Sequence, residues 1–146
     1  MRIQYKYLLL LGWMTLIFLL SAEGADGSRA RSGAIVGIIK DSFSADFTED
    51  FLSFLTRKAA HIIAYFILGL LIYSIIKTYK LTTKRTIVLS IVLALFYAVF
   101  DEIHQLFIPG RSGEVRDVFI DTAAASIGIS AYYLCNKIPY NRKNSK

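Results

Sequence analysis

The sequence lacks the features by which disulfide-stabilised domains, repeat proteins and β-barrels are recognised. It contains a single cysteine, Cys135, so no intramolecular disulfide can form, and we expect this residue to be a small buried side chain. It contains no internal repeat and no low-complexity tract. Its hydrophobic segments do not alternate apolar and polar residues with a period of two, which argues against a transmembrane β-barrel.

Motifs of the common enzyme classes are absent as well. The sequence has no GxSxG nucleophile segment, no glycine-rich phosphate loop and no cysteine–histidine nucleophile pattern. The HExxH zinc motif is missing, and the two histidines, His61 and His104, fall in different predicted helices. Together with Asp101 or Glu102 they could still supply imidazole and carboxylate ligands. The spacing nevertheless leads us to predict no metal site and no cofactor.

Apolar residues, in contrast, are abundant and come in blocks. The chain of 146 residues is 55% hydrophobic, and four blocks stand out at about 7–22, 59–76, 86–107 and 118–134. Each is about long enough to cross a bilayer as a helix. Buried parallel strands can also read as continuous apolar runs, but the length of these blocks and their leucine and alanine content favour helices. The sequence therefore predicts an all-α polytopic membrane protein with four transmembrane helices, forming one domain over residues 1–146.

Positive charge is distributed unevenly between these blocks. Ten of the 17 Lys and Arg residues lie in the N-terminal segment, the connection between the second and third blocks, and the C-terminal tail, which contain no acidic residue. Basic segments next to membrane spans stay in the cytoplasm. Both termini and the second connection are therefore predicted to be cytoplasmic, and the first and third connections to be outside. Membrane orientation thus explains the net charge of +6, and the expected partner is the lipid bilayer rather than nucleic acid.

The first block has an alternative interpretation as a signal peptide. The segment SAEGA, residues 21–25, offers the small residues that cleavage requires. Cleavage would leave three spans with the same orientation. In the long connection that follows, Ile35, Ile39 and Phe43 have helical spacing, which predicts a short helix lying on the outer membrane surface.

Polar residues from three parts of the sequence are expected to meet at the outer ends of the spans. The first set precedes the second span, the second ends the third span, and the third surrounds the turn before the fourth span. The three sets are Arg57, Lys58 and His61; Asp101, Glu102, His104 and Gln105; and Arg111, Glu114, Arg116, Asp117 and Asp121. Pro109 and the glycines of the PGRSG segment predict a tight turn between the third and fourth helices.

Helical spacing indicates which way these residues point. His61 and Tyr65 are four residues apart and share a face of the second span. Asp121 shares a face with Ala124 and Gly128, and such faces of small residues let membrane helices approach closely. We therefore expect the polar side chains to face the interior of the bundle and the third helix to continue to about residue 107.

Two kinds of role remain open for this polar group. Asp101, Glu102, His104 and His61 are the candidates for catalysis. Asp101 and His104 are one helical turn apart and could handle a proton, whereas the adjacent Asp101 and Glu102 point about 100° apart. The nearby cations almost balance the acids, so an ion-pair lid that only holds the helix ends together is the structural alternative.

At these residues the sequence resembles the VanZ-like family of small bacterial membrane proteins. The resemblance rests on RKAAHIIAYFILG (residues 57–69), on YAVFDEIHQLFIPGRSGEVRDVFIDTAAASIG (residues 97–128) and more loosely on LIFLLSA (residues 16–22). The family pattern carries over to Lys58, His61, Tyr65, Asp101, Glu102, His104, Gln105, Arg111, Asp117 and Asp121. A Gly or Asn that is common in the family near DTAAASIG is replaced here by Ala.

The resemblance implies a multi-pass protein of the bacterial cytoplasmic membrane that keeps its first span. The family is named for a protein linked to teicoplanin resistance. The leading hypothesis is an outward-facing polar pocket that binds an envelope lipid or a lipid-linked cell-wall intermediate. The ligand-binding residues would be Arg57, Lys58, His61, Tyr65, Asp101, Glu102, His104, Gln105, Arg111, Asp117 and Asp121. The alternatives are a membrane enzyme that modifies such a lipid or glycan, and a structural or partner-binding membrane subunit.

Overall fold

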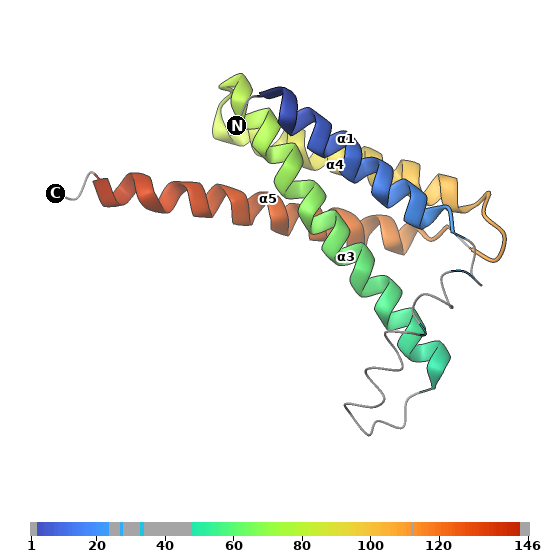
Figure 1. Cartoon of the computed structure of the whole chain (residues 1–146). Coiled ribbons are helices and arrows are strands. Elements are labelled where there is room, and N and C mark those ends of the chain that lie inside the picture. The colour runs from blue at the N-terminus through green and yellow to red at the C-terminus, as the bar shows by residue number, and fades with distance from the viewer. Residues whose placement is uncertain (1–2, 24–26, 28–32, 34–47, 112, 144–146) are drawn as a thin grey trace.

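Four long helices make up most of the chain. The computed structural model describes residues 3–23, 27, 33, 48–111 and 113–143. The elements are α1 (Ile3–Ser21), α3 (Glu49–Ile76), the short 3-10 helix η1 (Lys77–Tyr79), α4 (Thr83–Gln105) and α5 (Val115–Lys143). The four long helices are each long and apolar enough to cross a membrane, and the described residues include no strand (Figure 1). The prediction of an all-α membrane protein with four transmembrane helices is confirmed, while the predicted surface helix falls outside the described residues.

The helices extend beyond the apolar blocks because caps and partly polar turns also adopt helical structure. α3 begins at Glu49, before the apolar block at about 59–76, and its N-cap Thr48 accepts a hydrogen bond from the backbone N–H of Phe51. α4 runs through Asp101 and Glu102 without a break and ends at Gln105. The third helix therefore carries its acidic residues as part of the helix, as the sequence predicted, and ends slightly before residue 107.

The closest packing in the fold is the crossing of α3 over α5. A Cβ atom added to Gly69 would lie 2.1 Å from the carbonyl oxygen of Ala125, and one added to Gly128 would lie 2.1 Å from that of Phe66. No side chain fits at either position without moving a backbone. This confirms that the small-residue face of the fourth span allows close helix approach, and Figure 1 shows the two helices crossing.

α1 lies along α3 and α4 and is held there by polar contacts to backbone carbonyls. The Trp13 Nε1–H donates to the carbonyl of Ala64 at 2.9 Å, and the Tyr97 hydroxyl donates to the carbonyl of Met14 at 2.6 Å. Ile17 packs into the core beside Leu68. Most other large apolar side chains of α1 are exposed, which is expected of a helix whose outer face contacts lipid.

The two ends of the bundle have different compositions. At one end, here called the Asp101 end, α1 and α4 terminate and α3 and α5 begin. At the other, the Lys80 end, η1 joins α3 to α4 close to the start of α1, where the Lys6 ammonium group donates to the carbonyl of Ser74. Cys135 in the last turns of α5 is exposed, so the prediction of a buried side chain was wrong. Cys135 follows the apolar block at about 118–134, and α5 continues beyond this block to Lys143.

Candidate functional site

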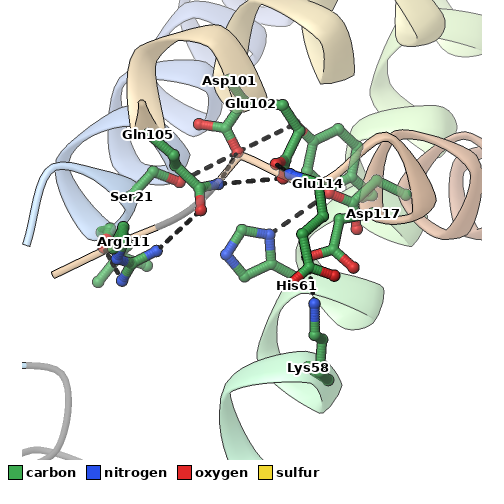
Figure 2. Close-up of polar contacts among 12 residues, drawn as sticks. Ser21, Lys58, His61, Asp101, Glu102, Gln105, Arg111, Glu114 and Asp117 are labelled. Carbon is green, nitrogen blue, oxygen red and sulfur yellow. Dashed lines mark hydrogen bonds and ion pairs between the residues drawn. The ribbon is translucent and has the colours of Figure 1, made fainter. Parts of the chain in front are cut away.

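The centre of the Asp101 end is the carboxylate of Asp101, which is 1% exposed. Its Oδ2 accepts hydrogen bonds from Ser21 Oγ at 3.0 Å, Tyr65 OH at 3.2 Å and Gln105 Nε2 at 3.4 Å (Figure 2). These three donors come from α1, α3 and α4, so one carboxylate oxygen links three helices. The other oxygen, Oδ1, is buried and has no hydrogen-bond partner among the residues that the structure describes.

Glu102 connects this centre to the turn before α5. Its Oε2 accepts the backbone N–H of Glu114 at 2.8 Å, and its Oε1 accepts Gln105 Nε2 at 3.2 Å. Adjacent residues on a helix point in different directions, and here Asp101 binds other helices while Glu102 binds the turn. Gln105 contacts both carboxylates, which fixes the relative positions of their side chains.

Arg111 closes the site from the side of the turn. Its Nε donates to the carbonyl of Glu23 at 2.9 Å, and its terminal nitrogens lie 3.4 Å from the carbonyl of Leu20 and 3.4 Å from Gln105 Oε1. All three acceptors are uncharged groups, so these contacts leave the positive charge of Arg111 without a directly bonded counter-ion. Burial lowers the pKa of Arg111, and the positive charge of Arg57 lowers this pKa further.

Two polar pairs connect α3 to α5. Lys58 forms an ion pair with Asp117, and His61 Nδ1 lies 3.4 Å from Asp121 Oδ2. The Asp121 side chain is almost fully buried, whereas that of His61 is partly exposed. Helical spacing explains both pairs, because Lys58 and His61 are three residues apart on α3, and Asp117 and Asp121 are four residues apart on α5.

These side chains surround a pocket of about 100 Å³ between α3, α5 and the turn. Its lining includes three cations, Arg57, Lys58 and Arg111, together with His61, Gln105 and Phe54. The remaining lining residues are Gly110, Glu114, Asp117, Ile120 and Asp121. The pocket therefore places two guanidinium groups and an imidazole around one space.

A family model described as VanZ/LLP1 matches residues 6–136 of the chain. The chain belongs to the VanZ/LLP1 family. The match includes all four long helices apart from the first residues of α1 and the last turns of α5. No curated protein and no solved structure was found to match this chain.

In this VanZ/LLP1 protein most of the predicted site residues lie together, but they form two layers. Arg57, Lys58, His61, Gln105, Arg111, Asp117 and Asp121 line the pocket. Tyr65, Asp101 and Glu102 lie behind it as buried groups. His61 and Asp121 line the pocket and also lie close to Asp101, since one ligand atom from each of the three residues lies within 4.8 Å of the others.

His104 lies apart from this group. Its ring stacks on Phe18 with a centroid distance of 4.1 Å, and its buried Nδ1 has no hydrogen-bond partner in the described part of the chain. The expected proton-handling pair of Asp101 and His104 is therefore not formed. The two residues are three apart in sequence, but α1 packs on α4 so that the His104 ring meets Phe18 while Asp101 turns towards Tyr65.

Ser21 and Glu114 belong to the site of this VanZ/LLP1 protein; Ser21 was missed, and Glu114 was placed in the polar group but not among the ligand-binding residues. Ser21 is fully buried and bonds Asp101, and the backbone N–H of Glu114 bonds Glu102. Ser21 belongs to the segment LIFLLSA, which carries part of the family resemblance. That resemblance was the available indication that Ser21 belongs to the site. The contact of Glu114 with Glu102 is made by its backbone N–H, which side-chain chemistry could not indicate.

Proposed function

We propose that this VanZ/LLP1 protein binds the anionic headgroup of an envelope lipid, or of a lipid-linked cell-wall intermediate, in the pocket at the Asp101 end. In this proposal the pocket opens to the outer face of the bacterial cytoplasmic membrane. In this proposal, occupancy of the pocket alters susceptibility to teicoplanin.

The observation that carries the proposal is that only one of the three cations in the pocket forms an ion pair with a described carboxylate. Lys58 is neutralised by its ion pair with Asp117. Arg57 and Arg111 line the same pocket and form no ion pair with any described carboxylate. Two guanidinium groups close enough for one to lower the pKa of the other are stabilised by a shared anion. Guanidinium groups bind phosphate and carboxylate through paired N–H donors, so either group in a lipid headgroup would fit.

The surroundings of the pocket suit a ligand that remains in the membrane. Phe54 lines the pocket and is 37% exposed, and Ile120 adds a second apolar side chain. Both belong to spans whose outer faces expose large apolar side chains to lipid. A headgroup can thus enter between α3 and α5 while its hydrocarbon chain stays outside, against Phe54 and the lipid-facing surface.

The test starts from the whole protein purified in a mild detergent. Native mass spectrometry should detect a co-purifying anionic lipid. Binding to nanodiscs that contain phosphatidylglycerol should weaken about tenfold in Arg57→Gln and in Arg111→Gln, the loss expected for one charge-assisted contact of about 1.5 kcal/mol. Arg116→Gln is the matched control, because Arg116 pairs with Glu114, is 65% exposed and does not line the pocket. Equal binding by all three variants would refute the proposal.

A second candidate function is supported by the contact between His61 and Asp121 at the pocket wall. An imidazole oriented by a buried carboxylate is a common general-base arrangement, and His61 faces the space where a headgroup would lie. This would make the protein an enzyme that modifies a lipid or glycan. Incubation with a headgroup-labelled lipid separates the two functions, since binding returns the lipid unchanged whereas catalysis yields a product that His61→Gln abolishes.

A further inference from the structure

We infer that His61, Asp101 and Asp121 form a binding site for one divalent transition-metal ion, with zinc as the ion that best fits the donor set. Each residue comes from a different helix, α3, α4 and α5 respectively. The set differs from the pair of histidines that the sequence suggested as ligands, since His104 lies elsewhere and Asp121 takes its place. The inference concerns a second occupant of the Asp101 end and stands independently of the lipid proposal.

The distances within the set suit a metal ion. One ligand atom from each residue lies within 4.8 Å of the other two. Two ligands of a tetrahedral zinc ion, each about 2.1 Å from the metal, are about 3.4 Å apart. His61 Nδ1 and Asp121 Oδ2 are separated by 3.4 Å, which matches that spacing. A change in the side-chain rotamer of Asp101 can bring the third ligand atom to the same spacing.

The hydrogen bonding of Asp101 provides a second, independent observation. This residue is 1% exposed, and its Oδ2 already accepts three donors. Its Oδ1 is equally buried and accepts none from the described residues. A buried carboxylate oxygen without a partner is costly, and a coordinated cation removes that cost.

The local negative charge also favours binding of a cation. Asp101 and Asp121 are 1% and 2% exposed, and their ligand atoms lie within 4.8 Å of each other. A neutral His61 leaves this group with two negative charges in a poorly solvated place. A divalent cation brings the group to neutrality, and it keeps His61 in the neutral form that metals bind. An imidazole among the ligands favours zinc over magnesium and calcium, which prefer oxygen ligands only.

The surroundings resemble those of a functional metal site. Ser21, Tyr65 and Gln105 orient Asp101 by hydrogen bonds, as second-layer groups commonly orient metal ligands. His61 and Asp121 also line the pocket, so three protein ligands leave a coordination position facing the pocket. A phosphate or carboxylate oxygen held by Arg57 and Arg111 could occupy that position.

The experiment measures metal binding by the full-length protein in detergent. The protein is treated with EDTA, exposed to zinc, freed of excess metal and analysed by inductively coupled plasma mass spectrometry. We expect about one zinc per chain, and an absorption spectrum of tetrahedral cobalt when Co²⁺ replaces zinc. His61→Gln, Asp101→Asn and Asp121→Asn should each lower the affinity at least about 100-fold, more than the loss typical of outer-layer changes. His104→Gln is the matched control and should bind as the wild type does.

Two outcomes would overturn the inference. One is a wild-type protein that retains no zinc and gives no cobalt spectrum. The other is an equal loss of metal in His104→Gln, which would indicate nonspecific binding. If Asp101→Asn fails to give a single peak in size exclusion, His61→Gln decides, because the His61 side chain is 20% exposed and least important for packing. Measuring lipid binding in EDTA separates this inference from the lipid proposal. Arg57→Gln and Arg111→Gln should weaken lipid binding even when no metal is present.

Discussion

Both ends of the helix bundle carry many charged residues, but these residues are exposed at one end and partly buried at the other. At the Lys80 end Lys77, Lys80 and Lys84 are all exposed, and no acidic residue is present among η1 and its flanking turns. At the Asp101 end Asp101 and Asp121 are almost completely buried, each in contact with other helices. Exposed lysines beside a span serve to orient the protein in the membrane. Buried carboxylates are costly to place in a membrane bundle, which is why they indicate function.

The largest expected difference between the ends is their accessibility from outside the cell. In a Cys135→Ser background we expect Val115→Cys to react with an impermeant thiol reagent in intact cells and Lys80→Cys to react only after lysis. Val115 is 74% exposed and Lys80 is exposed as well, so burial does not limit either reaction. The reason is the basic composition of the Lys80 end, because basic segments beside membrane spans tend to stay in the cytoplasm. Labelling of Lys80→Cys in intact cells would reverse the proposed orientation and place the pocket inside.

The next largest effect should come from the helix crossing that lies between the two ends. Gly128→Leu puts a side chain where even a Cβ would meet the Phe66 carbonyl at 2.1 Å, so α3 and α5 must separate. We expect a loss of at least about 3 kcal/mol in unfolding free energy, at the upper end of overpacking effects. The readout is folded yield and thermal unfolding in detergent by fluorescence-detected size exclusion.

The control for the crossing is Ile127→Leu. Ile127 is 62% exposed and points away from α3, so its replacement should leave the yield unchanged. Similar yields for the two variants would show that the close approach of α3 and α5 contributes little to the fold.

The spans could be predicted from sequence because span length and apolar content are local properties. Residues 86–105 read as a helix from their composition, and the spacing of Asp121, Ala124 and Gly128 indicated the face that packs on α3. The apolar block at about 59–76 covers only part of α3, because the first turns of this helix mix charged and apolar residues and do not read as a membrane segment. A single N-cap residue such as Thr48 is a weak indication of where a helix starts when many polar residues lie nearby in the sequence.

Most residues of the candidate site could be predicted from the sequence, but the contacts between them could not. Helix periodicity placed His61, Asp101 and Asp121 on inward faces, which the structure shows to be close together. It could not indicate that Ser21 would reach Asp101 across 80 positions of sequence, or that Phe18 would cover His104. Those contacts depend on the rotation of α1 about its own axis. The even apolar character of α1 does not fix that rotation, because exposed leucines surround most of the helix.

A third prediction tests how far the fold itself depends on the Asp101 centre. Asp101→Leu leaves the donors of Ser21, Tyr65 and Gln105 without their common acceptor in a buried place. We expect a loss of about 2–3 kcal/mol in unfolding free energy, because each unsatisfied buried donor costs about 1–3 kcal/mol and some can find other partners. Thermal unfolding is measured in EDTA, so that metal binding does not contribute.

Asp101→Asn is the matched variant for this prediction. The amide oxygen of Asn can still accept two of the three donors, so the expected loss is about 1 kcal/mol, well below that of Asp101→Leu. Zinc binding and the effect on teicoplanin susceptibility should nevertheless be lost. If Asp101→Asn is as unstable as Asp101→Leu, the carboxylate acts as an ion-pair lock of the helix ends, and the functional interpretation of the site fails.

The smallest expected effect concerns Lys80 itself. Lys80 has a φ of 55° and a ψ of 30°, the left-handed conformation that costs a residue with a Cβ about 1–2 kcal/mol. Lys80→Gly and Lys80→Ala remove the same charge, but only glycine relieves this conformation, at some cost in unfolded-chain entropy. Lys80→Gly should therefore be more stable than Lys80→Ala by about 0.5–1 kcal/mol, and both should bind zinc and phosphatidylglycerol as the wild type does. A change in either binding would show that the Lys80 end is coupled to the pocket at the other end of the bundle. Its positive charge would then have a second role besides orientation.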